Sequence, residues 1–280
     1  MKTSNKLLIA LAVALVVIPI LVVAINVKLN YKSASKWSEN LTSLHDFETE
    51  SSGFKKEKIT QNFNEINFVG QKGLMLNLTL IKSSSKGIKL SDGESSAIKS
   101  RVDANGVLQI SFNEQKNSNF KSVTLAIYGP EVNRLKINDL LQLRLTAKAD
   151  DLNLDVSNLQ SMAVDVNSRI NKLTVSGNQL KNFSIDREIA SELNLNLINS
   201  EFKTAWASYK KLSINASGAS SVNITGDDQD RNKYKIDELV LNSTGSPFIS
   251  ISRIHVSQSS VNLSDSTVVS MPAQYLKNKN

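Results

Sequence analysis

A short repeated unit of apolar, polar and apolar residues constrains the fold more than any other feature of the sequence. The unit recurs about every ten residues between Leu135 and Val269, with small or polar residues in between. Such alternation is typical of half-buried β-strands, and one unit is too short to bury its own apolar pair. Stacked units would share a continuous core. The clearest units are Leu152-Asn-Leu154, Met162-Ala-Val164, Leu173-Thr-Val175, Phe183-Ser-Ile185, Leu193-Asn-Leu195, Phe202-Lys-Thr204, Leu212-Ser-Ile214 and Val222-Asn-Ile224.

The repeat permits two coil lengths. Two units per coil give about 20 residues, and three give about 30. We favour the shorter coil, because the Ser/Thr-Gly pairs at Gly177, Gly218 and Gly245 recur irregularly and far apart. The polar run at residues 226–235 interrupts the rhythm and predicts a surface loop. The many Asn and Ser residues suit turns, since their side chains bond to nearby backbone.

Alternation of period two begins near Lys58, before the repeats. Five runs of this kind, separated by glycine turns, lie between residues 63 and 128, and Asn105-Gly106 predicts a hairpin. We therefore predict an all-β fold. Its parallel β-helix or solenoid-like body has an antiparallel-leaning N-terminal strand region, occupies residues 58–270 and ends in a tail at residues 271–280.

An unbroken apolar run from Leu7 to Ile25 precedes the body. Its length approaches the hydrocarbon thickness of about 30 Å, which predicts one transmembrane helix anchoring the chain at residues 7–27. A cleaved signal peptide is the alternative, but the run is longer than usual and no small-x-small cleavage site follows closely. We expect a short cytoplasmic end at residues 1–6, a linker at 28–57, and a single-pass protein of the cell membrane. Its C-terminal body would be exported to the periplasm or cell surface.

The linker permits two structures. Trp37, Leu41 and Leu44 have helical spacing, which allows a short amphipathic helix near the membrane. A plain polar spacer fits equally well.

Composition excludes several kinds of chemistry. The chain has no cysteine, which excludes disulfides, thiolate metal sites and a cysteine nucleophile. The net charge is +7, but the lysines are scattered and are not interleaved with aromatics. Stacking on nucleic acid favours such interleaving, so we expect no nucleic-acid partner.

Few residues are candidates for catalysis. The two histidines, His45 and His255, have no second His or Cys at metal-ligand spacing, and His255 alternates with apolar neighbours so that it faces outward. Asp155 and Asp165 follow successive units at the same register, so they could stack on one face and bind Ca²⁺ or act as an acid pair. The alternative, which is more common for carboxylates that face solvent, is that they are simply solvated. We expect no catalytic residue, no metal site and no cofactor.

Trp206, Tyr209, Lys210 and Lys211 are the candidate binding residues. They lie in a segment with an unusual density of aromatics for this chain. Aromatic rings beside lysines can stack on sugar rings. The alternative is that Trp206 and Tyr209 fill a corner between coils.

The order of the elements carries a resemblance to a known family. The relevant segments are residues 63–70, 75–80, 98–112 and 123–132, followed by repeats with the turn Ser217-Gly218-Ala219. In this order they resemble the bacterial putative auto-transporter adhesin, head GIN domain family, over roughly residues 58–270. The resemblance implies a parallel β-helix-like fold in the envelope of a Bacteroidota-type bacterium, and the family name suggests adhesion. The Ser-Gly-Ala turn is clear only once, which departs from the family pattern.

These features together favour a non-enzymatic, membrane-anchored extracytoplasmic protein. Its β-solenoid surface would bind a glycan, a cell-envelope component or a protein partner. The alternatives are a carbohydrate-active β-helix enzyme acting on an acidic polysaccharide, and a tether that reports on the state of the envelope. The very short N-terminal end argues against the tether.

Overall fold

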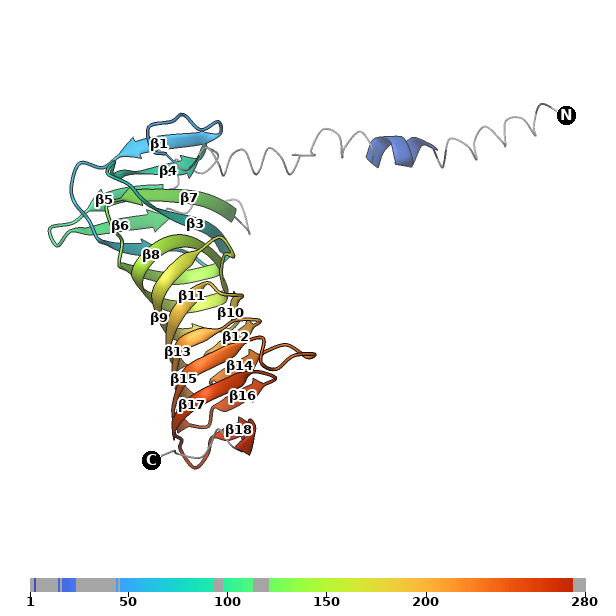
Figure 1. Cartoon of the computed structure of the whole chain (residues 1–280). Helices are drawn as coiled ribbons and strands as arrows, with labels where there is room; N and C mark the ends of the chain where they lie inside the picture. The colour runs from blue at the N-terminus through green and yellow to red at the C-terminus, as the bar shows by residue number, and fades with distance from the viewer. Residues whose placement is uncertain are drawn as a thin grey trace. The chain divides into compact units, whose positions relative to one another are not determined.

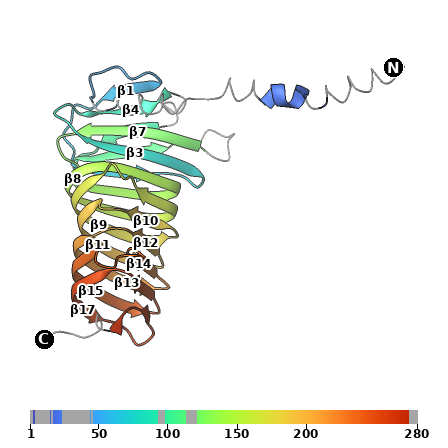
Figure 2. The ribbon, with the colours of Figure 1, turned by 45° about the vertical axis from the view of Figure 1, so that its right-hand side comes forward.

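The protein is mostly β, with one curled sheet. The computed structural model describes residues 3, 15, 17–23, 44, 46–92, 98–112 and 121–273, in two units, Met1–His45 and Asp46–Asn280. Within the described residues the second unit holds an 18-stranded sheet (Figures 1 and 2). Its strands are β1 (Phe54–Lys58), β2 (Glu65–Val69), β3 (Leu74–Lys82), β4 (Gly87–Ser91), β5 (Ile98–Val102), β6 (Val107–Phe112), β7 (Lys121–Gly129), β8 (Arg134–Val164), β9 (Arg169–Leu180), β10 (Phe183–Asp186), β11 (Ala190–Ile198), β12 (Glu201–Ala205), β13 (Tyr209–Gly218), β14 (Ser221–Thr225), β15 (Lys235–Gly245), β16 (Phe248–Ser252), β17 (His255–Asn262) and β18 (Val268–Ser270).

The first unit contributes a short helical segment at residues 17–23, whose apolar side chains are exposed. No helix among the described residues is long and apolar enough to cross a membrane. The remainder of the expected anchor at 7–27 lies outside the described residues. So do His45 and the expected linker up to residue 43.

From β8 onward the chain winds in coils of two strands, and each strand pairs in parallel with the strand two places later. Leu173 pairs with Leu193, which in turn pairs with Leu212. These pairings confirm the parallel arrangement and the shorter coil of about 20 residues, two units each. The next step, from Leu212 to Leu239, is longer because the loop at residues 226–235 lies between β14 and β15. Successive coils follow one another down the stack in Figure 2.

The long strand β8 joins the N-terminal strands to the coils. It pairs with β2 and β3 on one side and with β9 and β10 on the other. It bends where Asp139 and Asn158 have positive φ values of 59° and 56°. The same corner recurs in the following coils, mostly with Asn or Gly, the residues that tolerate left-handed backbone best. The corner residues are Asp139, Asn158, Gln179, Asn199, Gly218 and Gly245.

The core is built from the apolar residues of each repeated unit, stacked in register. Leu173, Leu193 and Leu212 are fully buried in one ladder of strands. In the other ladder the rings of Phe183 and Phe202 lie 5.0 Å apart. Burial of these columns stabilises the stack, since each coil covers the apolar face of the next.

Serine side chains satisfy the backbone where the coils turn. The Ser200 hydroxyl accepts a hydrogen bond from the Leu180 amide at 3.0 Å. The Ser220 hydroxyl accepts one from the Ser200 amide at 3.2 Å, one coil further on. Both serines are buried, so these bonds replace the water that an exposed turn would use.

The N-terminal strands pair in both directions. β1 with β4, β4 with β7, and β5 with β6 are antiparallel. β2 and β3, in contrast, run parallel to β6, β7 and β8, so the antiparallel-leaning expectation holds only for part of this region. The predicted hairpin at Asn105-Gly106 is confirmed: it joins β5 to β6, with Gly106 at a φ of 75°.

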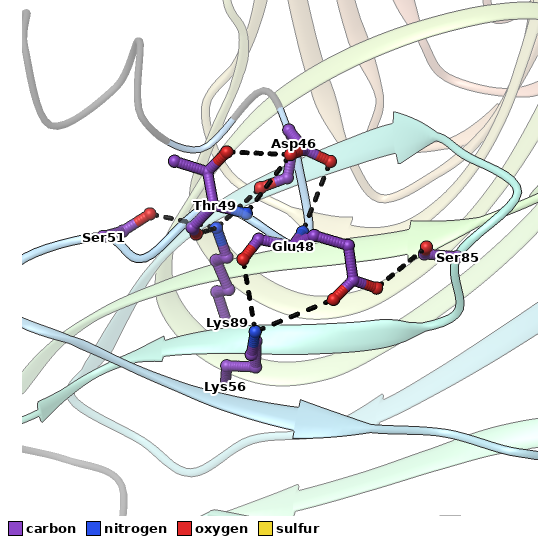
Figure 3. A network of polar contacts seen from close by, with 7 residues as sticks. All are labelled: Asp46, Glu48, Thr49, Ser51, Lys56, Ser85 and Lys89. Atoms are coloured by element: carbon purple, nitrogen blue, oxygen red, sulfur yellow. Dashed lines mark hydrogen bonds and ion pairs between the residues drawn. The ribbon is translucent and has the colours of Figure 1, made fainter.

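The unit that contains the sheet begins at Asp46, upstream of the expected start near Lys58. A polar clasp, which we define as residues 46–51 with Lys89, holds this segment on the sheet (Figure 3). Lys89 is only 1% exposed. Its ammonium donates hydrogen bonds to the Asp46 and Thr49 carbonyl oxygens at 2.7 and 2.6 Å and to the Ser51 hydroxyl at 3.0 Å.

Candidate functional site

A groove of about 620 Å³ runs along the corner where successive strands of one ladder begin. We call it the corner groove. It crosses several coils, from the middle of β8 to the start of β15. It is lined by Ala149, Asp150, Arg169, Ile170, Asn171, Glu188, Ile189, Ala190, Ser191, Ser208, Tyr209, Lys210, Lys235 and Asp237.

The groove arises because each coil has two consecutive outward residues at this corner. In β8, Ala149 lies against the core and Leu152 is buried, whereas Asp150 and Asp151 between them are exposed. Two adjacent outward residues interrupt the alternation of buried and exposed side chains, and the strand register repeats this interruption in every coil. Residues from distant parts of the sequence therefore form columns. The first outward column is Asp150, Asn171, Ser191, Lys210 and Asp237, and the second is Asp151, Lys172, Glu192, Lys211 and Glu238.

The corner groove has both charge signs in equal number. Its carboxylates are Asp150, Glu188 and Asp237, and its cations are Arg169, Lys210 and Lys235. Lys235 and Asp237 form an ion pair at 3.2 Å. The Arg169 guanidinium donates to the backbone carbonyl oxygens of residues 166 and 168.

Three of the groove's charged groups are available for a ligand. No ion pair of Asp150, Glu188 or Lys210 occurs within the part of the chain that the structure describes. They lie on different coils, so they are spread along the groove. Charged groups of this kind form strong hydrogen bonds with polar ligands such as hydroxyl groups.

The second outward column alternates in charge along the stack. Asp151, Lys172, Glu192, Lys211 and Glu238 are neighbours in register, and Lys211 contacts Glu238 at 2.6 Å. Opposite charges on adjacent strands stabilise the pairing modestly. This column therefore supports the coil register.

The structure separates the four predicted binding residues. Lys210 lines the corner groove, and Lys211 faces Glu238 in the neighbouring column. Trp206 is 53% exposed in the turn before β13. Tyr209 lies at the groove wall but is only 2% exposed, with its hydroxyl 2.8 Å from that of Thr204. The Tyr209 ring therefore fills the coil interior, as the corner-filling alternative described, and its face is not available for stacking.

Asp155 and Asp165 do not stack on one face, so the possible acid pair does not form. Asp155 lies in the ladder that continues with Ser176, and it accepts hydrogen bonds from Arg134 at 2.9 and 3.0 Å. Asp165 lies in the turn after β8, where it accepts bonds from Asn167. Successive units belong to alternate ladders of a two-strand coil, so the same register within a unit does not place residues on one face.

Sequence reasoning missed most of the corner groove. Arg169, Glu188, Lys235 and Asp237 are far apart in the chain and match no motif. The available signal was the recurrence of paired outward residues, Asp150-Asp151, Lys210-Lys211 and Asp237-Glu238, at intervals of whole coils. His255 is exposed at the start of β17, as expected. No group of three or more potential metal ligands occurs within residues 46–92, 98–112 and 121–273.

The loop at residues 226–235 leads into the groove at Lys235. Asp227 accepts a hydrogen bond from the Lys233 ammonium at 2.8 Å, and this bond is the main reason that the pKa of the Asp227 carboxyl is lowered. Asp228 forms an ion pair with Arg253. The first contact lies within the predicted surface loop, orange in Figure 1, and the second ties the loop to the next coil.

Comparisons with known proteins give only distant structural likenesses. No protein-family profile and no curated protein matches the chain. A solved putative adhesin from Parabacteroides merdae is 14% identical, with 78% of this chain and 94% of that chain covered and a TM-score of 0.39. A putative adhesin from Bacteroides fragilis is 16% identical, with 79% and 98% covered and a TM-score of 0.39. A putative lipid binding protein from Parabacteroides distasonis is 11% identical, with 79% and 96% covered and a TM-score of 0.37.

Proposed function

We propose that this chain is a non-enzymatic, adhesin-like binding protein that holds a neutral polysaccharide in the corner groove. The observation that carries the proposal is the set of three charged groups without an ion pair in the described chain, Asp150, Glu188 and Lys210, spread along a pre-formed groove that crosses several coils. A carboxylate accepts hydrogen bonds and an ammonium donates them, so these groups can bond to hydroxyl groups on successive sugar units, since a hydroxyl group does both. Binding would be distributed over several coils of a rigid scaffold, which limits the entropy lost on association.

The balance of charge favours a neutral polymer over an acidic one. The three carboxylates Asp150, Glu188 and Asp237 offset the charge of the three cations, so the groove offers no net attraction to an acidic polymer. A neutral polymer needs no such attraction, because its hydroxyl groups bond to both kinds of charged group. The chain's net charge of +7 is spread over the surface and is not concentrated in this groove.

We further propose that residues 7–27 anchor the protein in a cell membrane and that the body is exported. The apolar run from Leu7 to Ile25 supports this part of the proposal. Leu15 and residues 17–23 present apolar side chains that are 44–68% exposed, which is the surface a lipid environment would cover. An anchored body would display its groove at the outer side of the membrane.

The test is binding of the full-length chain to immobilised neutral polymers (dextran, mannan and laminarin) and to acidic ones (alginate and polygalacturonate). We expect at least one neutral polymer to bind more tightly than both acidic ones. The double substitution Asp150→Ala with Lys210→Ala should then weaken binding by about tenfold or more, the equivalent of one lost charged hydrogen bond.

Lys181→Ala is the matched control. Lys181 is exposed in the turn between β9 and β10 and does not line the groove, so its loss should leave binding unchanged. Tighter binding of the acidic polymers, or equal effects of the groove and control variants, contradicts the proposal. Cleavage of any polymer by the purified chain contradicts its non-enzymatic part.

A further inference from the structure

We infer that Trp206 is a stacking platform for one pyranose ring of the polysaccharide and that Arg187 donates hydrogen bonds to the hydroxyl groups of the same ring. This inference rests on the proposed function and names the contact that would supply an apolar component of binding. Its starting point is a second corner of the coils, distinct from the one occupied by Asn158 and Gly218. We call the residues Arg187, Trp206, Gly226 and Arg253 the Trp206 column.

Backbone hydrogen bonds establish the order of the column. The Arg187 amide donates to the Ala205 carbonyl oxygen, and the Trp206 amide donates to that of Thr225. The Gly226 amide donates to the carbonyl oxygen of Ser252. Each bond continues the parallel pairing by one residue, so the four column residues occupy equivalent positions on successive coils.

Trp206 is an unexpected residue at this position. Its φ is 56°, in the left-handed region that bulky side chains rarely adopt. The other corner shows that Asn or Gly can make such a turn, as Asn199 and Gly218 do. Arg187 and Arg253 of the column share this backbone conformation, with φ values of 68° and 58°, and Trp206 is the aromatic residue among them. Its side chain is 53% exposed, so more than half of its surface is open to a ligand. Backbone strain at an exposed aromatic residue is typical of a site kept for binding.

The column leaves space beside the indole. On the next coil the equivalent residue is Gly226, which has no side chain. It must be glycine because a Cβ atom there would overlap the Arg253 carbonyl oxygen. The column residue on the next coil therefore has no side chain that could cover the Trp206 indole.

Polar groups surround this apolar platform. Arg187, on the coil before Trp206, is exposed and has no ion-pair partner within the described part of the chain. Glu188 follows it directly and lines the corner groove, as does Ser208, two residues after Trp206. Arg253 is already paired with Asp228. The Trp206 column therefore adjoins the groove, and one polymer can contact both.

The combination fits a neutral pyranose. A sugar ring has an apolar C–H face, which an indole face can contact, and a rim of hydroxyl groups. The Arg187 guanidinium can donate two parallel hydrogen bonds to that rim, and the Glu188 carboxylate can accept from it. The opposite charges of Arg187 and Glu188 offset each other, so they give no net attraction to a sugar carboxylate, which agrees with the neutral polymer proposed for the groove.

The test uses full-length chain carrying Trp37→Phe, which leaves Trp206 as the single tryptophan of the two in the sequence. Titration with whichever of dextran, mannan and laminarin binds most tightly should change the Trp206 fluorescence saturably, with the same Kd as direct binding. Trp206→Asn should reduce affinity by at least tenfold. Its Tm should equal or exceed that of the parent, because Asn tolerates a positive φ.

Phe248→Ala removes another exposed aromatic side chain, 42% exposed on β16, and should leave affinity unchanged. If the parent binds and Trp206→Asn binds equally well, the stacking inference is wrong while the proposed function stands. If the parent binds none of the neutral polymers, the proposed function fails and this inference fails with it.

Discussion

Replacement of Lys89 by Met should release the segment that precedes β1. The ammonium of Lys89 lies 5.6 Å from the Tyr128 ring centroid as well as bonding to the clasp acceptors (Figure 3). Burial lowers the pKa of Lys89, and the charge of Asp46 partly opposes this effect. Met preserves the unbranched stem and its packing on Tyr128 but cannot donate a hydrogen bond.

The loss of stability depends on the three hydrogen-bond acceptors that no longer have a donor in the Lys89→Met variant. Each bond from a charged donor contributes about 1.5–3 kcal/mol, so three such bonds set an upper range of roughly 5–9 kcal/mol. Relief of the cost of burying the ammonium offsets several kcal/mol of this loss. The carbonyl oxygens of Asp46 and Thr49 also regain water if the segment opens. We therefore expect the free energy of unfolding of the clasp to fall by about 2–3 kcal/mol.

Amide hydrogen exchange of full-length chain tests this prediction. Lys89→Met should lose protection at the amides of Thr49 and Phe54, which are bonded within the segment, while the coil amides stay protected. Lys55→Met is the matched control. Lys55 is exposed on β1 and makes no ion pair within the described part of the chain, so its loss should cost less than about 0.5 kcal/mol. Equal protection in Lys89→Met and the parent chain would refute the reasoning.

Three further predictions concern the turns and the register. Asp103 accepts hydrogen bonds from the Gln109 side chain and the Val107 amide, and these bonds lower the pKa of its carboxyl below 3.8. The stability that the ionised Asp103 contributes is therefore present above pH 3.8 and is lost as the pH falls through the lowered pKa. Melting curves should show Asp103→Asn less stable than the parent chain at pH 7, with the difference vanishing in acid. Gly226→Ala should lower Tm by several degrees, because its Cβ meets backbone that cannot move alone; an unchanged Tm contradicts the close approach. Lys211→Glu should reduce the free energy of unfolding in urea by up to about 1 kcal/mol, because the new carboxylate lies between Glu192 and Glu238. Adding Glu238→Lys should restore the part lost at position 238 but not the part lost at Glu192; the absence of any rescue argues against the pairing.

The regular part of the fold was accessible from the sequence because one physical rule governs it. Each unit such as Leu193-Asn-Leu195 alternates with period two, and its recurrence limited the coil to about 20 or about 30 residues, of which the structure has the shorter. The polar run at 226–235 was recognisable as a loop, and it accounts for the long steps from β13 to β15 and from β14 to β16. Asn105-Gly106 gave the hairpin, since that pair favours the required positive φ values.

The start of the body could not be predicted for an equally physical reason. β1, with sequence FKKEK, has no buried alternation, because it is an edge strand that pairs only with β4 in the described chain. The segment before it is held by Lys89, and a lysine is normally assigned to the surface. Only its three acceptors make this buried position favourable.

The candidate site was predictable in part. Lys210 was identified from local composition, and it does line the corner groove. Glu188 and Asp150 reach the same groove only through the register of successive coils. That register follows from the coil length. The corner also requires two consecutive outward residues, and these interrupt the alternation of apolar and polar residues on which the prediction of the strands was based. The sequence left open whether Tyr209 binds a ligand or fills a corner between coils, because it does not show that the Tyr209 hydroxyl meets Thr204 inside the coil.

Hydrogen exchange of the full-length chain with and without the tightest-binding neutral polymer tests the central claim most directly. The proposed contacts predict that the polymer adds protection at residues 186–191, 206–210 and 226–237. Little change is expected in the β1–β7 region. Added protection confined to β1–β7, or to the exposed face of β16 and β18, would contradict the assignment of the corner groove as the binding site.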